Sequence, residues 1–156
     1  MSLKPRRVAD LFLRRRATLA VAESCTGGLI MHALTGVPGS SRYLRGGVVA
    51  YANDLKRTLL GVSAATLRRQ GAVSQETALE MAAGIKRRAR STVGLAVTGI
   101  AGPGGGTPTK PVGTVFLACA AGRHIYFKKF AFPGNRAAVK EKTKEAALAF
   151  LLACLT

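Results

Sequence analysis

A few polar side chains of this 156-residue chain have the chemistry needed for covalent catalysis. Ser24, Cys25 and Ser41 are candidate nucleophiles, and each lies in a short turn rich in small residues. A serine needs a base to take its proton, and the two histidines lie in a helical pattern and at a hairpin, without a nucleophile signature. A neutral lysine is the remaining option, and Lys56 is the candidate base.

Lys56 occupies a position at which its charge is disfavoured. If Asn53 caps the helix expected over 53–60, Lys56 falls in the first helical turn, where a cation opposes the helix dipole. That placement favours the neutral amine and lowers the pKa of the lysine, and burial would lower it further. The competing interpretation is an exposed lysine beside Asp54. Cys25, near another helix start, is expected to have a lowered thiol pKa, although no histidine is placed to pair with it.

Three turns rich in Gly, Ser and Thr are candidate binding loops. The first, residues 22–28, follows an apolar run and precedes a helix, so its free N–H groups and the positive helix end would face an anion. The others are residues 38–41 and 98–106. The segment 99–111 has neither the Gly-Lys-Ser/Thr of a P-loop nor a helix after its glycines. We interpret it as a binding or lid loop, with a flexible connector as the alternative.

Alternating helices and strands must position these turns. Helical periodicity predicts helices over 4–16, 28–34, 53–60, 64–70, 74–90 and 137–155, and apolar runs predict strands over 18–23, 46–51, 93–97, 113–120 and 124–132. Strands alternate with helices early in the chain and form a hairpin late in it. This order predicts a three-layer α/β/α sandwich with a mixed, mostly parallel sheet. Because the sequence has no repeat or linker, 1–156 is expected to be a single domain.

Charge is the unusual bulk property, with 24 basic against 7 acidic residues and a formal net charge of +17. The basic residues occur in short scattered groups on expected helix faces, which favours a solvated surface and no specific nucleic-acid partner. No apolar run reaches membrane-spanning length and no signal-peptide pattern follows the basic start, so we expect a cytoplasmic protein. The three cysteines lack metal-ligand spacing, so we expect no metal site and no disulfide framework.

Several segments in a fixed order resemble the CinA C-terminal domain family. They are residues 22–28, 38–41, 46–53 with Lys56, 71–74, 98–103, 110–115 and 134–136, and they cover nearly the whole chain. Enzymes of that family, of the PncC type, are nicotinamide-nucleotide amidases that convert nicotinamide mononucleotide to nicotinate mononucleotide and ammonia without metal or cofactor. The resemblance implies a fold like that of the anticodon-binding-domain group.

The resemblance also implies a serine amidohydrolase and a set of site residues. Ser41, Tyr51 and Lys56 would form the catalytic group, with Ser41 as the nucleophile. The resemblance, the turn at 22–28 and the loop after 98 together indicate which residues would bind the substrate phosphate and the reacting carbonyl. The residues expected to contact substrate are Ser24, Thr26, Gly27, Gly28, Thr98, Gly99 and Arg136.

The expected partner is therefore a small molecule, a pyridine mononucleotide. Because family members often form dimers, a homodimer is expected as well. Two alternatives to an amidase remain open: a catalytically silent nucleotide-binding domain, and a nucleic-acid-associated protein linked to competence or DNA damage, which the charge would suit.

Overall fold

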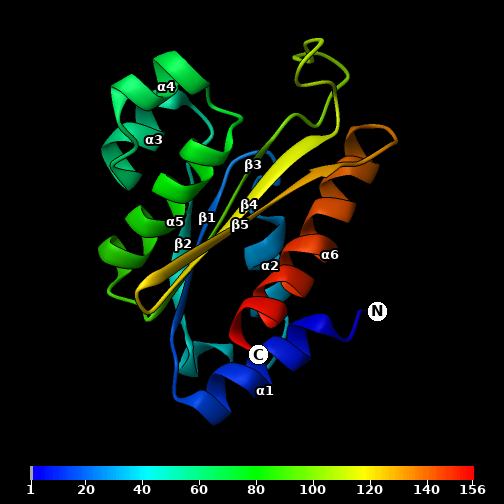
Figure 1. The fold of residues 1–156 in the computed structure, drawn as a ribbon. Coiled ribbons are helices and arrows are strands. Elements are labelled where there is room, and N and C mark those ends of the chain that lie inside the picture. The colour runs from blue at the N-terminus through cyan, green and yellow to red at the C-terminus, as the bar shows by residue number, and fades with distance from the viewer. Residues whose placement is uncertain (1) are drawn as a thin grey trace.

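The computed structural model describes residues 2–156, which contain one mixed sheet of five strands packed between helices (Figure 1). The strands are β1 (Leu19–Glu23), β2 (Leu44–Val49), β3 (Val93–Gly99), β4 (Thr114–Ala121) and β5 (His124–Ala131). The helices are α1 (Lys4–Arg15), α2 (Leu29–Thr35), α3 (Asn53–Leu60), α4 (Ala64–Gln70), α5 (Gln75–Ala89) and α6 (Arg136–Leu155), with a short 3-10 helix, η1, at Ser40–Arg42.

The sheet has the order β2-β1-β3-β4-β5. Strand β1 pairs in parallel with both β2 and β3, and β4 pairs antiparallel with both β3 and β5, so β4 alone runs against the other four strands. The carboxyl ends of β1, β2 and β3 therefore meet at one end of the sheet. In open α/β sheets that end is where ligands bind.

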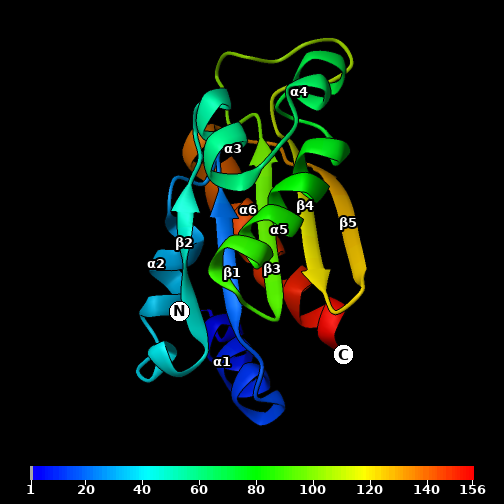
Figure 2. The same cartoon turned by 90° about the vertical axis from the view of Figure 1, so that its left-hand side faces the viewer.

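Helices cover both faces of the sheet (Figures 1 and 2). Helices α3, α4 and α5 lie on one face, and α1, α2 and α6 lie on the other. Alternate residues of β1 point to opposite faces, so Leu19 and Val21 join the core under α1, α2 and α6, while Ala20 and Ala22 join the core under α3 and α5. The predicted three-layer sandwich with a mixed, mostly parallel sheet is confirmed.

One glycine lets α5 approach the end of α3 closely. A Cβ at Gly84 would lie 1.8 Å from the carbonyl oxygen of Leu60, a distance that no other residue could tolerate. The close approach fixes α3 against α5, and α3 carries Lys56. The packing of a buried helix pair thus positions a residue of the candidate site.

The predicted elements are all present, with local differences around β2. This strand covers 44–49 and not 46–51, because its pairing with β1 already begins at Leu44. Tyr51 consequently lies in the loop after the strand. The N-cap of α3 is Ala52 and not Asn53, so Asn53 is the first residue of the helix. The short helix η1 falls in a segment for which the sequence predicts a loop.

The edge strand β5 is unusual because most of its side chains are exposed on both faces of the sheet. Ile125, Tyr126 and Phe127 are each more than two-fifths exposed. Its outer edge has no neighbouring strand among residues 2–156. No helix in the described part of the chain is both long enough and apolar enough to span a membrane.

Candidate active site

A cavity of about 210 Å³ opens at the carboxyl ends of the three parallel strands. It receives Ser24 from the turn after β1, Tyr51 from the loop after β2, and Thr98 from the end of β3. Arg136, the first residue of α6, reaches it from across the sheet. The lining residues are Ser24, Cys25, Tyr51, Asn53, Lys56, Ala72, Val73, Thr98, Gly99, Ala101 and Arg136.

Lys56 is the central polar group of this cavity. Its side chain is only 1% exposed. The Nζ atom lies 3.0 Å from Oγ of Ser24, 2.9 Å from the carbonyl oxygen of Ala50 and 2.9 Å from that of Tyr51. No carboxylate pairs with it among the described residues. Burial without a counterion disfavours the ammonium form and lowers the pKa of Lys56.

The direction of the hydrogen bond between Lys56 and Ser24 depends on the protonation state of the lysine. The carbonyl oxygens of Ala50 and Tyr51 can only accept, so they take both N–H groups of the neutral amine. In the ammonium form Nζ donates to Oγ of Ser24, whereas in the neutral amine the lone pair of Nζ faces Ser24 and the serine hydroxyl donates. This is the arrangement of a nucleophile bound to its general base.

Tyr51 and Arg136 meet at the rim of the cavity. The Tyr51 ring is 59% exposed, and its hydroxyl accepts a hydrogen bond of 2.9 Å from Nη2 of Arg136. The other terminal nitrogen of Arg136 donates to the carbonyl oxygen of Gly102, at 2.7 Å. Lys56 contacts the backbone carbonyl of Tyr51 and not its phenol, so the hydroxyl of this residue, predicted to belong to the catalytic group, has no direct contact with the lysine.

Thr98 and Gly99 form the floor of the cavity where β3 ends. The hydroxyl of buried Thr98 donates to the carbonyl oxygen of Ala72 at 2.7 Å, which ties the 71–74 turn to the sheet. A Cβ on Gly99 would lie 2.7 Å from Cγ2 of Val115 and 3.1 Å from Sγ of Cys25. Both residues therefore line the cavity, and Gly99 is required for close packing there.

The turn after β1 is closed to an anion by a carboxylate of the chain itself. Glu23 is fully buried and accepts hydrogen bonds from the Thr26 hydroxyl and from the backbone N–H groups of Gly28, Ile30 and Met31. These are the donors at the start of α2 that an incoming anion would need. The prediction that this helix start takes the substrate phosphate is corrected, because Glu23 already occupies it.

Thr26, Gly27 and Gly28, which were predicted to bind substrate at this turn, have structural roles instead. Thr26 is 1% exposed, and its hydroxyl donates a hydrogen bond to the carboxylate of Glu23. The N–H of Gly27 donates to the carbonyl oxygen of Ser24 at 3.1 Å. Gly27 and Gly28 both have positive φ, so they shape the turn that presents Ser24.

Ser41 lies outside the site. It belongs to η1, which precedes β2, whereas Tyr51 and Lys56 follow the same strand. The six residues of β2 separate the two ends by roughly 20 Å. Ser41 therefore cannot pair with Lys56 of the same chain, and that prediction is corrected. The serine that contacts Lys56 is Ser24, which we had predicted to bind substrate.

Cys25 lines the cavity but is poorly suited to attack. Its thiol is buried, and burial raises the pKa of Cys25 to about 11. The expected lowering by the helix start does not occur, since Glu23 neutralises that helix end and water is excluded from the thiol.

Two residues near the cavity escaped the sequence prediction. The exposed Asn53 presents a side-chain amide to the cavity from the first position of α3. Lys140 lies one helical turn after Arg136, and its Nζ would be 3.6 Å from a Cβ on Gly27. The spacing of four residues from Arg136 on an expected helix was the available signal for Lys140. In the described part of the chain, no group of His, Cys, Asp and Glu side chains gathers as metal ligands.

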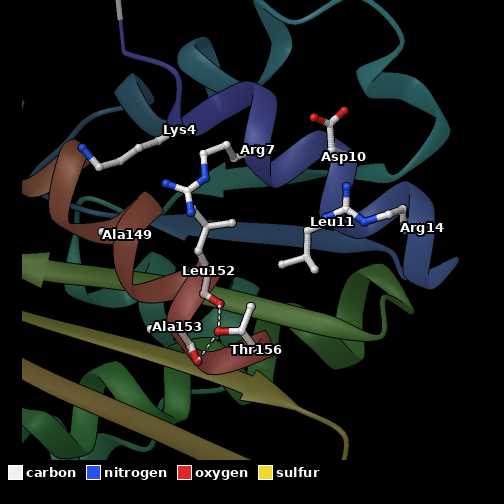
Figure 3. A pocket seen from close by; sticks show the side chains of 9 residues that line it. All are labelled: Lys4, Arg7, Asp10, Leu11, Arg14, Ala149, Leu152, Ala153 and Thr156. Carbon is white, nitrogen blue, oxygen red and sulfur yellow. Dashed lines mark hydrogen bonds between the residues drawn. The ribbon is translucent and has the colours of Figure 1, made fainter.

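A larger hollow of about 430 Å³ lies between α1 and α6 (Figure 3). Its lining includes Lys4, Arg7, Asp10 and Arg14, and the hydroxyl of Thr156 is bound to carbonyl oxygens of its own helix. None of these side chains forms a nucleophile–base pair. The smaller cavity is therefore the candidate active site.

Comparison with known proteins covers almost the entire chain. A model of the CinA C-terminal domain matches residues 3–155. A putative competence-damage inducible protein of Desulforudis audaxviator is 55% identical over 141 residues, which is 90% of this chain and 34% of that protein. A CinA-like protein of Salinibacter ruber is 50% identical over the same shares of each chain. The chain thus spans about a third of the length of these relatives.

Solved structures share the fold over most of their length. The competence/damage inducible protein CihA from Agrobacterium tumefaciens superposes with a TM-score of 0.93 at 44% identity, covering 96% of this chain and 92% of that one. A CinA superfamily protein from Escherichia coli superposes with the same TM-score at 34% identity, covering 96% and 87%. The names of these two proteins refer to competence and damage and specify no reaction.

Proposed function

Because the chain belongs to the CinA C-terminal domain family, which includes amidases, we propose that its cavity hydrolyses the carboxamide of nicotinamide mononucleotide to nicotinate mononucleotide and ammonia. The observation that carries the proposal is the Ser24–Lys56 pair, in which a buried amine without a counterion and with a lowered pKa lies 3.0 Å from a hydroxyl. Ser24 replaces Ser41 as the proposed nucleophile.

Acylation begins at Ser24. Its Oγ attacks the carboxamide carbon while Lys56 takes the hydroxyl proton, which gives a tetrahedral oxyanion and a lysine ammonium. The ammonium then returns the proton to the amide nitrogen as the C–N bond breaks. Ammonia leaves and an ester links the nicotinoyl group to Ser24.

Deacylation repeats these steps with water. Lys56, neutral again, takes a proton from a water molecule that attacks the ester carbonyl. Collapse of the second tetrahedral intermediate breaks the bond to Oγ, and the protonated lysine reprotonates Ser24. The acid product then departs as a carboxylate.

Backbone groups of the same turn are suited to stabilise the oxyanion. The N–H of Ser24 is used by the carbonyl oxygen of Val97 at 3.1 Å, so it is not available. Within residues 2–156, the N–H groups of Cys25 and Thr26 donate to no carbonyl or side-chain oxygen. We assign the oxyanion to these two groups, because they directly follow the nucleophile.

The size of the cavity suits one end of the substrate. A volume of about 210 Å³ is below the range of about 300–1,000 Å³ that holds a complete drug-sized ligand, so the pyridine ring enters and the ribose phosphate stays at the rim. Arg136 and Lys140 lie there, and both are cations without a carboxylate partner in the described chain. They are the proposed phosphate ligands, and the side-chain amide of Asn53 is the proposed hydrogen-bond partner of the carboxamide.

Ammonia release from nicotinamide mononucleotide by the purified chain tests this function. We expect turnover by the natural sequence, none by Ser24→Ala, and no requirement for added metal. Tight binding of the nucleotide without any ammonia release would favour the alternative of a silent nucleotide-binding domain. The experiment addresses this chain, since the relatives are about three times as long.

We also propose that the chain forms a homodimer. Support comes from β5, an edge strand whose backbone groups on one side have no partner among residues 2–156 and could pair with the same edge of a second copy. Sedimentation velocity over a range of concentrations tests this, and a monomer at all of them would contradict it.

A further inference from the structure

The end of the sheet opposite the cavity is strongly basic. Here β1, β2 and β3 begin, β4 ends, and helices α1 and α5 terminate (Figures 1 and 2). The cations gathered at this end, called the basic pole below, are Arg15, Arg16, Arg45, Lys86, Arg90 and Arg123. They come from four segments that are distant in sequence.

Hydrogen bonds hold these segments together. Nε of Arg45 donates to the carbonyl oxygen of Ala89 at 3.1 Å, which connects β2 with the end of α5. Nζ of Lys86 donates to the carbonyl oxygen of Gly122 at 2.7 Å, which connects α5 with the β4–β5 turn. These two contacts tie β2, α5 and the β4–β5 turn together, so the surface that carries the basic pole is part of the packed fold.

No acidic side chain neutralises the basic pole. None of the seven acidic residues falls between positions 81 and 140. In the described part of the chain, salt bridges involve only Lys4 and Lys144 among the cations, so every arginine is unpaired. Unpaired cations held together raise the local positive potential and attract polyanions.

Two grooves flank the β4–β5 turn at this pole. One, of about 390 Å³, is lined by Lys86, Arg90 and Arg123 together with Ile125. The other, of about 400 Å³, is lined by Arg15 and Arg16 together with Tyr126. Gly122 lines both, and neither is lined by Asp or Glu.

Each groove combines cations with an exposed flat or apolar side chain. Ile125 is 44% exposed and Tyr126 is 42% exposed, although both lie on a strand. Single-stranded nucleic acids bind to this combination, since the cations follow the backbone phosphates and an aromatic ring stacks on an unpaired base.

We propose that the basic pole binds single-stranded nucleic acid, with phosphates at the cations and a base stacked on Tyr126. The contacts are with phosphates and a ring face, so binding is independent of base sequence and depends steeply on salt. We favour a single strand over an anionic membrane because the cations line two grooves, a shape that suits an extended chain of phosphates. The pole is separated from the cavity by the length of β1, roughly 17 Å, and does not depend on the proposed amidase chemistry.

Fluorescence anisotropy with a labelled oligodeoxythymidylate of about 16 nucleotides tests the proposal. The variant Arg15→Glu/Arg123→Glu removes one cation from each groove. Its matched control, Arg68→Glu/Arg69→Glu, makes the same charge change in the exposed last turn of α4, near the other end of the molecule. We expect the pole variant to bind at least about tenfold more weakly than the control, with a slope of log K against log salt smaller by about 1.4, at 0.7 per lost contact.

The variant Tyr126→Leu separates stacking from charge. We expect it to bind the single strand about tenfold more weakly than the natural chain, with an unchanged salt slope. Three results would overturn the proposal: no binding by the natural chain, equal weakening in the pole and control variants, or binding to phosphatidylglycerol vesicles without binding to the oligonucleotide. Full affinity in Tyr126→Leu would overturn the assignment to single strands.

Discussion

The guanidinium of Arg136 and the hydroxyl of Tyr51 are joined by a hydrogen bond of 2.9 Å at the rim of the cavity. The same guanidinium holds the carbonyl oxygen of Gly102 at 2.7 Å. One side chain thus connects the loop after β2 with the glycine-rich loop after β3. A phosphate that binds Arg136 competes for these donors, so substrate binding and the positions of both loops are coupled.

Loss of Arg136 should weaken binding of the nucleotide more than catalysis. For Arg136→Ala we expect KM for nicotinamide mononucleotide to rise about 10- to 100-fold with kcat less affected, because a charge-assisted phosphate contact contributes ~1.5–3 kcal/mol. Lys140→Ala should have a smaller effect in the same direction. Lys142→Ala, an exposed lysine on the same helix, is the control. Steady-state ammonia release measures all three, and equal turnover of the nucleoside and the nucleotide would show that the phosphate is not bound here.

The two candidate serines can be distinguished directly. Ser24→Ala should lose more than about a thousandfold in kcat, and adding Lys56→Met to it should make little further difference, because the two groups act as a unit. Ser41→Ala should keep nearly full activity, since Ser41 lies at the far end of β2. Circular dichroism checks that each variant is folded. An inactive Ser41→Ala beside an active Ser24→Ala would reverse the assignment.

Activity should depend on pH through Lys56. The base must be neutral, and burial lowers the pKa of Lys56 from its ordinary 10.5. We therefore expect kcat/KM to rise as pH rises through this lowered pKa and to be lost as pH falls below it. Lys56→Arg should be inactive at every pH, because a guanidinium does not lose its proton. A pH–rate profile measures this, and activity that falls as pH rises across the same range would contradict a lysine base.

The thiol of Cys25 should be unreactive and dispensable. With a pKa of about 11, only about one thiol in ten thousand is ionised at neutral pH. Cys25→Ala should keep activity within roughly fivefold, since only cavity packing changes. Iodoacetamide should label the half-buried Cys154 before Cys25, and peptide mass spectrometry follows the order. Preferential labelling of Cys25 with loss of activity would point to a thiol nucleophile.

Glu23 should matter for stability through the donors it satisfies. Glu23→Gln keeps the shape of the side chain, but an amide nitrogen cannot accept, so at least one buried N–H at the start of α2 loses its partner. We expect unfolding free energy to fall by about 1–3 kcal/mol in urea titrations. Glu76→Gln, an exposed carboxylate in the first turn of α5, should change it by less than about 0.5 kcal/mol. Equal losses would show that the buried carboxylate contributes no more than an exposed one.

The sequence was sufficient for the fold because the relevant signals are local. Helical and alternating periods, with Ser74 and Asn135 as N-caps, mark the elements, and their order determines the layers. The same reasoning placed Lys56 on the helix after β2, where the structure has it, but it put Tyr51 at the end of the strand and not in the loop that follows. The prediction that Ser41 lies beside Lys56 failed because a strand between two residues separates them in space even when they are near in sequence.

The remaining differences arise from contacts that only the folded chain contains. The side chain of Glu23 folds back and accepts hydrogen bonds from the N–H groups at the start of α2. A glycine-rich turn in the sequence does not reveal that contact. The raised pKa of Cys25 likewise results from burial under segments distant in sequence. Ser24 could be distinguished from Ser41 only by the distance to Lys56.

The open edge of β5 also bears on how this protein behaves in concentrated solution. When two copies pair through β5, neither edge remains free to bind another chain. An unpaired edge can bind further chains and promote aggregation. Lys128 and Lys129 oppose such growth by repulsion, and added salt screens that repulsion. Solutions of this cationic protein should therefore become more turbid on heating as ionic strength rises, and replacing both lysines with glutamine should bring on turbidity at lower salt.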